Sequence, residues 1–81
     1  MAYCRLGPDC DVYLFANLKG RYEFVLSDRA DWSPFKNDFT VETAQEALQA
    51  LKDLRWLGLR IDQYAFDRLE KEIAEETGSA P

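Results

Sequence analysis

The sequence contains no histidine among its 81 residues. Histidine is the commonest general acid or base in enzymes, and both the Ser-His-Asp and the Cys-His catalytic arrangements depend on it. Glycine is sparse as well: the four glycines do not cluster, so the sequence has no glycine-rich loop of the kind that binds phosphate groups. From these absences we predict a protein that is not an enzyme and that needs no cofactor.

Cysteine is almost as scarce, with only Cys4 and Cys10 on either side of a Gly-Pro-Asp turn signal at residues 7–9. A structural zinc site takes four ligands, and two cysteines without histidine do not complete one. We therefore predict no metal site and interpret both residues as packed thiols, because a free cysteine behaves as a small hydrophobic residue. The alternative is a cysteine-based metal-binding protein whose other ligands are carboxylates or come from a second chain.

Long hydrophobic runs and an excess of basic residues are also absent. The longest apolar run, Val12–Ala16, is far shorter than the roughly 20 residues that span a bilayer, and the N-terminus does not resemble a signal peptide. The formal net charge of -5 disfavours contact with nucleic-acid phosphates or anionic membranes. We therefore expect a cytoplasmic protein whose partner is neither a nucleic acid nor a membrane.

What remains is the composition of a folded domain, with 47% hydrophobic and 14% aromatic residues. Residues 10–16 and 21–26 are rich in β-branched and aromatic side chains, and they flank a loop at 17–20 that ends in glycine, which predicts a β-hairpin. A short strand over residues 2–6 extends this hairpin to a three-stranded antiparallel meander. Alternation along the strands predicts one buried face, with Val12, Leu14, Tyr22, Phe24 and Leu26. The opposite face is predicted to carry Tyr13, Phe15 and Val25 among the charged residues Asp11 and Glu23.

Residues 27–39 are punctuated by Ser, Asp, Asn and Pro, which predicts a loop. We expect its aromatic side chains, Trp32, Phe35 and Phe39, to fold back over the sheet. Residues 40–42 are a candidate short extra strand.

Two helices are predicted after the strands. Thr43 and Glu46 have the spacing of a capping box, and Gly58 is the natural end of the helix that follows it. Asp62 is a favourable N-cap for a second helix. The predicted fold class is therefore α+β, a small antiparallel sheet packed against a two-helix hairpin, in one domain over residues 1–76 with a disordered tail at 77–81.

Four aromatic residues fall off the predicted apolar faces: Trp56, Tyr64, Tyr13 and Phe15. Tryptophan and tyrosine on a surface are the usual anchors of protein–protein contacts. We therefore predict that these residues bind a protein partner.

Each of these predictions has an alternative. Trp56 could instead pack over the end of the helical hairpin or stack on Lys52. Tyr13 and Phe15 could be covered by residues 30–39, or by a second copy of the chain in a homodimer.

The last predicted helix is rich in carboxylates, which we interpret as one acidic face: Asp67, Glu70, Glu72, Glu75 and Glu76. Such a run is usually a solvated helix face. The alternative is an acidic mimic of a nucleic-acid backbone that inhibits a host DNA-binding, RNA-binding or defence protein.

Two parts of the sequence resemble a group of small bacteriophage proteins that is common in phages of actinobacteria. The first part is MAYCR at residues 1–5 followed by CDVY at 10–13, and the second is LRxLG at 54–58 followed by QYA at 63–65 and Leu69. The resemblance covers about the first thirty residues and residues 54–72. It implies a phage or prophage origin and action in the bacterial cytoplasm, but no mechanism, because the group has no established activity. The sequence thus predicts a non-enzymatic phage accessory protein that binds a bacterial host protein.

Overall fold

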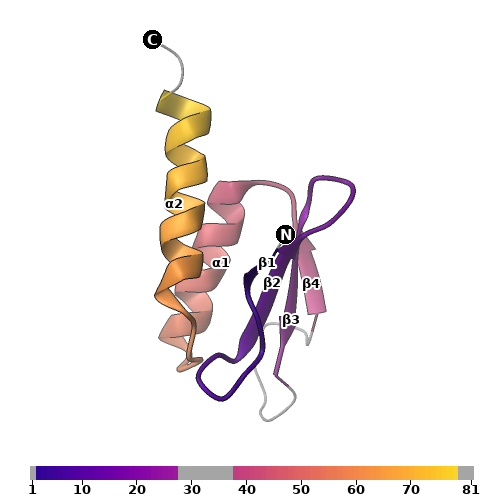
Figure 1. The fold of residues 1–81 in the computed structure, drawn as a ribbon, viewed down its shortest axis with the longest axis vertical. Coiled ribbons are helices and arrows are strands. Elements are labelled where there is room, and N and C mark those ends of the chain that lie inside the picture. The colour runs from indigo at the N-terminus through magenta and orange to yellow at the C-terminus, as the bar shows by residue number, and fades with distance from the viewer. Residues whose placement is uncertain (1, 28–37, 79–81) are drawn as a thin grey trace.

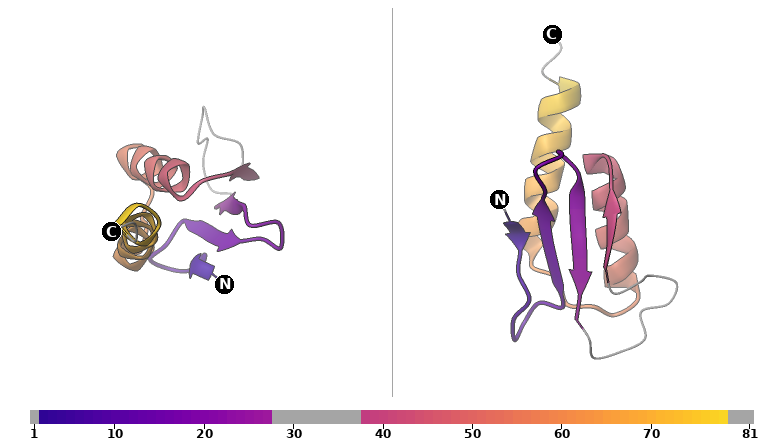
Figure 2. Two further views of the ribbon diagram at one scale, coloured as in Figure 1. Left: turned by 90° about the horizontal axis from the view of Figure 1, so that it is seen from above. Right: turned by 90° about the vertical axis from the view of Figure 1, so that its right-hand side faces the viewer.

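The computed structural model describes residues 2–27 and 38–78. Four strands precede two helices, with the bounds β1 (Ala2–Cys4), β2 (Val12–Ala16), β3 (Tyr22–Leu26), β4 (Asp38–Val41), α1 (Ala44–Trp56) and α2 (Gln63–Gly78). The strands form one antiparallel sheet in the order β1-β2-β3-β4. Both helices lie on the same face of this sheet (Figures 1 and 2). The α+β class is confirmed, with one strand more than the predicted meander.

The turns between the first three strands form where the sequence predicts them. Gly7 and Cys10 exchange backbone hydrogen bonds of 3.0 and 3.3 Å around the Pro8-Asp9 corner, which shortens the strands on both sides. In the hairpin loop, Oδ1 of Asn17 accepts hydrogen bonds from the backbone N–H groups of Lys19 and Arg21. Gly20 takes a φ of 77°, the left-handed region that glycine adopts without strain.

Strand β4 corrects the prediction for residues 27–39. It begins at Asp38, so Phe39 belongs to the sheet and not to a loop. Phe39 lies opposite Phe24 in the register, and the two rings stack with centroids 4.6 Å apart. The apolar area buried in this cross-strand pair favours a strand over a loop. Trp32 and Phe35 lie outside the described residues.

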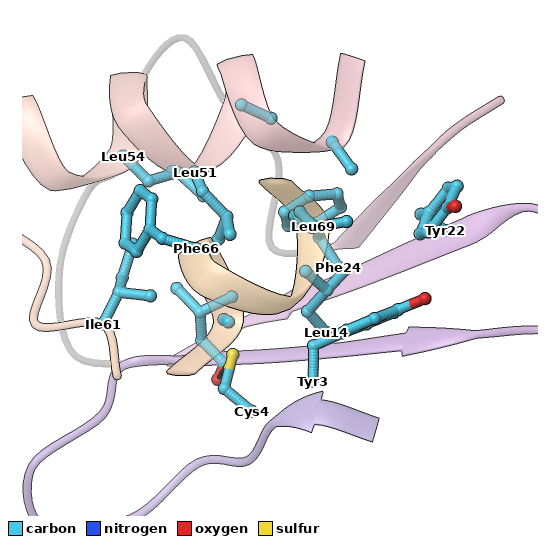
Figure 3. Close-up of a cluster of buried hydrophobic side chains, with 14 of the residues drawn as sticks. Tyr3, Cys4, Leu14, Tyr22, Phe24, Leu51, Leu54, Ile61, Phe66 and Leu69 are labelled. Atoms are coloured by element: carbon cyan, nitrogen blue, oxygen red, sulfur yellow. Dashed lines mark hydrogen bonds between the residues drawn. The ribbon is translucent and has the colours of Figure 1, made fainter. Parts of the chain in front are cut away.

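The core lies between the sheet and the helices. The inward side chains of β2 and β3 are buried as the alternation predicts: Val12, Leu14, Tyr22, Phe24 and Leu26. Helix α1 contributes a buried stripe at helical spacing: Ala44, Ala47, Ala50, Leu51 and Leu54. Figure 3 shows Leu14 and Phe24 of the sheet within the same cluster as Leu51 of α1 and Leu69 of α2.

Both ends of α1 have the predicted caps. The Thr43 hydroxyl accepts from the backbone N–H of Glu46, whose side chain accepts from the backbone N–H of Thr43. At the other end Gly58 has a φ of 103°, and Leu59 donates its backbone N–H to the carbonyl of Leu54 at 3.2 Å. These bonds form a Schellman motif, which ends the helix and buries Leu59.

Helix α2 begins at the predicted cap and ends later than predicted. Oδ1 of Asp62 accepts from the backbone N–H of Tyr64 at 3.1 Å. The helix continues to Gly78, past the predicted domain end at residue 76. Residues 79–81 lie outside the described residues. None of the helices in the described part of the chain has the length and apolar character to cross a membrane.

The connection between the helices is bound to the start of β2 by a buried carboxylate. Asp11, which the alternation predicts on the opposite face of the sheet, is instead only 3% exposed, because its side chain accepts a hydrogen bond from the backbone N–H of Arg60 at 2.9 Å. The Asp11 backbone N–H donates to the Arg60 carbonyl at 2.7 Å, and the Arg60 guanidinium lies 3.5 Å from the carboxylate. These bonds fix the loop that joins α1 to α2 against the sheet.

Candidate functional site

Trp56 is the most exposed aromatic side chain among the described residues, at 89% relative exposure. It is the last residue of α1, and the helical period places it away from Leu51 and Leu54, which face the sheet. At this exposure the indole does not pack over the helical hairpin or against Lys52. The alternative interpretation of Trp56 as a hairpin cap is therefore wrong, and its predicted surface position is confirmed.

A surface hollow of about 460 Å³ lies beside Trp56, between the end of α1 and the first turns of α2. We call its lining the Trp56 surface: Lys52, Arg55, Trp56, Gln63, Phe66 and Glu70. The two helices meet here because the connection between them is short, which places the last turn of α1 beside the first turn of α2. Aromatic residues and arginine are enriched in protein–protein interfaces, so Trp56 and Arg55 are the residues of this surface that fit a protein-binding patch.

Arg55 is held in place within the Trp56 surface. Its guanidinium carbon lies 3.9 Å from the centroid of the buried Phe66 ring, a close cation–π contact. The same guanidinium donates to the carbonyl of Ile61 at 3.3 Å and to Oε1 of Gln63 at 3.2 Å. A side chain held by several contacts loses little conformational entropy when a partner binds, so this part of the surface is preorganised.

Tyr64 lies on a different part of the surface. It is 51% exposed, and its hydroxyl accepts from Nη1 of Arg68 at 3.1 Å. It lines a second hollow together with other α2 residues, Asp67, Arg68, Lys71, Glu72 and Glu75. None of these residues lines the hollow of the Trp56 surface, so the structure does not unite Tyr64 with Trp56 in one site.

Tyr13 and Phe15 occupy a third surface, the face of the sheet opposite the helices. Both side chains are half-buried, and their ring centroids are 4.7 Å apart. The predicted cover, residues 30–39, lies outside the described residues up to residue 37. The predicted partner-binding residues are thus divided among three surfaces.

Glu72 corrects the prediction of one acidic face on α2. Its carboxylate accepts hydrogen bonds from the hydroxyl of Tyr3, at 2.9 and 2.7 Å to its two oxygens, and from the hydroxyl of Tyr22 at 3.1 Å. Nε of Arg68 lies 3.6 Å from the same carboxylate, whose side chain is 22% exposed. Burial, and then the bond to Glu72, raises the pKa of Tyr3 above its ordinary value. Glu72 therefore links α2 to β1 and β3.

The other predicted acidic residues are separated around the helix. Glu70 lies on the Trp56 surface, whereas Asp67 and Glu75 line the hollow beside Tyr64. The side chain of Glu76 lies outside the described residues. Lys71 and Arg68 line the same hollow as Asp67 and Glu75, so positive charge is mixed with the negative charge there.

Cys4 and Cys10 are both buried as free thiols that form no disulfide, which confirms their interpretation as packed thiols. Both thiols donate to the carbonyl of Val12, at 3.2 and 3.3 Å. Burial, with a smaller contribution from the neighbouring Cys10, raises the pKa of Cys4 to about 12. Within residues 2–27 and 38–78, no group of three His, Cys, Asp or Glu side chains is arranged to hold a metal ion.

The sequence reasoning finds Trp56 but misses Arg55 and Phe66. In the sequence, Arg55 is a charged residue in the last turn of one predicted helix, and Phe66 is an apolar residue in the first turn of the next. The short connection between the two helices is the feature of the sequence that indicates that Arg55 and Phe66 lie close together.

Compared with known protein families, curated proteins and solved structures, the chain shows no match.

Proposed function

We propose that this chain is a non-enzymatic accessory protein that binds another protein through the Trp56 surface. The observation that carries the proposal is the 89% exposure of Trp56 beside a hollow whose wall, Arg55, is held by Phe66, Ile61 and Gln63. Tryptophan and arginine are the residue types most enriched in binding hot spots. An exposed indole has apolar surface that a partner can remove from water, and the fixed guanidinium orients polar groups of that partner.

The resemblance to small phage proteins supports a bacterial host protein as the partner, met in the bacterial cytoplasm. Two competing functions have weaker support. An acidic mimic needs a continuous carboxylate field. Glu70 lies on a different surface from Asp67 and Glu75, and Glu72, which lines the same hollow as those two, is bonded to Tyr3 and Tyr22 and lies beside Arg68. A metal-binding role for the cysteines needs further ligands, and among the described residues no group of three His, Cys, Asp or Glu side chains is arranged to hold a metal ion.

Replacing Trp56 by alanine is expected to weaken partner binding about 30-fold, the effect of losing a hot-spot side chain worth about 2 kcal/mol. The free energy of unfolding should change by less than about 0.5 kcal/mol, because the indole is exposed. The measurement is a pull-down from bacterial lysate, followed by titration calorimetry with the recovered protein.

Leu18→Ala is the matched control. Leu18 is also a fully exposed large apolar residue, but it lies in the loop between β2 and β3 and not on the Trp56 surface. Equal recovery of the partner by wild type, Trp56→Ala and Leu18→Ala would contradict the proposal.

The salt dependence of binding separates this proposal from the acidic mimic. Docking that buries an indole should lose less than about fivefold in affinity between 50 and 500 mM salt, because the hydrophobic contribution is not screened. A mimic should lose several orders of magnitude. The affinity of the recovered partner would be measured across this range for wild type and for a Glu75→Gln variant. A steep loss with salt, together with weaker binding by Glu75→Gln, would favour the mimic.

A further inference from the structure

The sheet face opposite the helices carries two rows of side chains that cross all four strands. The register places Tyr13, Val25 and Asp38 side by side, and the guanidinium of Arg5 extends this row 6.0 Å from the centroid of the Tyr13 ring. The second row contains Ala2, Phe15, Glu23 and Thr40. We call these two rows the outer face.

No helix or strand of the described residues covers the outer face, as the right-hand view of Figure 2 shows. Its apolar side chains, Tyr13, Phe15 and Val25, are half-buried, and the rings of Tyr13 and Phe15 are in contact. Antiparallel sheets that are solvated on one face usually alternate apolar and polar residues, and three apolar side chains here break that pattern. The remaining apolar area favours burial against a second surface.

The charges on the outer face are separated by sign. Arg5 follows β1 at one side of the sheet, whereas Asp38 begins β4 at the other side. Both are exposed, and neither has an ion-pair partner among the described residues. They lie three strand spacings apart, roughly 14 Å, so they do not pair within one chain.

We propose that the outer face binds a second copy of this chain, with a two-fold axis that lies in the interface and runs parallel to the strands. Such an axis reverses the order of the strands across the interface, so β1 of one copy faces β4 of the other. Arg5 then lies opposite the partner's Asp38, and Tyr13 opposite the partner's Val25, and each contact occurs twice. In this arrangement the first row of one copy faces the first row of the other, so that opposite charges meet and apolar side chains meet.

The other two-fold axis in the interface, perpendicular to the strands, does not give this match. It places the first row over the second, so that Arg5 lies opposite Ala2 and Asp38 lies opposite Thr40. No ion pair forms in that arrangement, and Asp38 comes near the Glu23 carboxylate of the second copy. Charge therefore selects the axis parallel to the strands.

The size of the face determines the strength of the dimer. The longest strands have five residues, so a face four strands wide has a footprint of at most roughly 17 by 19 Å, or about 300 Å². This is below the approximately 800 Å² per partner of a standard stable interface. The dimer is therefore weak and concentration-dependent, with a dissociation constant of roughly 100 μM.

Charge reversal tests the arrangement. Sedimentation equilibrium of the whole chain at concentrations up to about 1 mM would be measured for wild type, Arg5→Asp, Asp38→Arg and the double variant. Each single variant opposes like charges twice and should raise the dissociation constant at least about tenfold. The double variant restores opposite charges across the interface and should return it to near the wild-type value. Because these residues are too far apart to pair within one chain, such a recovery reports an intermolecular contact.

Two further variants complete the test. Phe15→Glu, which introduces a charge in the centre of the face, should abolish the dimer, whereas Trp56→Ala should leave it unchanged. A wild-type chain that stays monomeric at 1 mM would overturn the proposal. A dimer that the double variant does not recover, or that Trp56→Ala dissociates, would overturn it as well.

Discussion

Replacing Glu72 by alanine is expected to lower the free energy of unfolding by about 2–3 kcal/mol. The substitution removes the carboxylate that accepts hydrogen bonds from the hydroxyls of Tyr3 and Tyr22, whose rings are buried. Hydrogen bonds to a charged group are each worth about 1.5–3 kcal/mol, and the partial exposure of Glu72 reduces their sum. In a domain of this size such a loss is a large fraction of the total stability.

The matched control is Glu75→Ala, which removes the same group from the next turn of α2. Glu75 is exposed, so its substitution should change the free energy of unfolding by less than about 0.5 kcal/mol. Glu72→Gln keeps one acceptor oxygen and should have an intermediate effect. Urea unfolding followed by circular dichroism measures all three variants. Equal effects of Glu72→Ala and Glu75→Ala would show that the carboxylate does not hold α2 to the sheet.

These two glutamates show which parts of the fold the sequence could predict. The caps of α1, the hairpin loop and the alternation in β2 and β3 depend on residues within a few positions of each other, so spacing was enough to predict them. The role of Glu72 depends on Tyr3, which lies 69 positions earlier in the chain. Local spacing assigned Glu72 to the same solvated face as Glu75, because both lie off the apolar stripe of the helix.

The same distinction applies to the candidate sites. The helical period alone predicted that Trp56 is exposed, since Leu51 and Leu54 define the buried stripe. The hollow beside it needs residues of both helices, and Phe66 forms its floor only because α2 packs beside α1. On the outer face the alternation predicted Tyr13 and Phe15, but the charge pattern needed β4, whose register brings Asp38 beside Val25. The helical period and the strand alternation therefore predict the exposed aromatic residues but not the charged residues around them.

Raising the pH above 9 is expected to destabilise the protein steeply, through the buried thiol of Cys4. Burial raises the pKa of this thiol from 9.0 in an accessible cysteine to about 12 in the folded chain. Between these values the folded state keeps a proton that the unfolded state has lost, so the free energy of unfolding falls as the pH rises. The contribution is fully present below pH 9 and decreases by about 1.4 kcal/mol per pH unit above it.

The pKa of Tyr3 is raised in the same direction, from an ordinary value of 10.0, so its contribution to this loss begins about one pH unit higher. Urea unfolding at intervals from pH 8 to 11 therefore distinguishes the two groups. Cys4→Ala should reduce the slope of the free energy of unfolding against pH between pH 9 and 10, where the folded wild-type chain binds up to about one proton more than the unfolded chain. Tyr3→Phe should leave that interval unchanged and reduce the slope only above pH 10. If wild type and Cys4→Ala lose stability in parallel from pH 9 to 10, the Cys4 thiol does not control the alkaline transition. The expected order of the two effects follows from the ordinary pKa values, 9.0 for the thiol and 10.0 for the phenol, because each group begins to lose its proton in the unfolded chain at that pH while burial keeps it neutral in the folded chain.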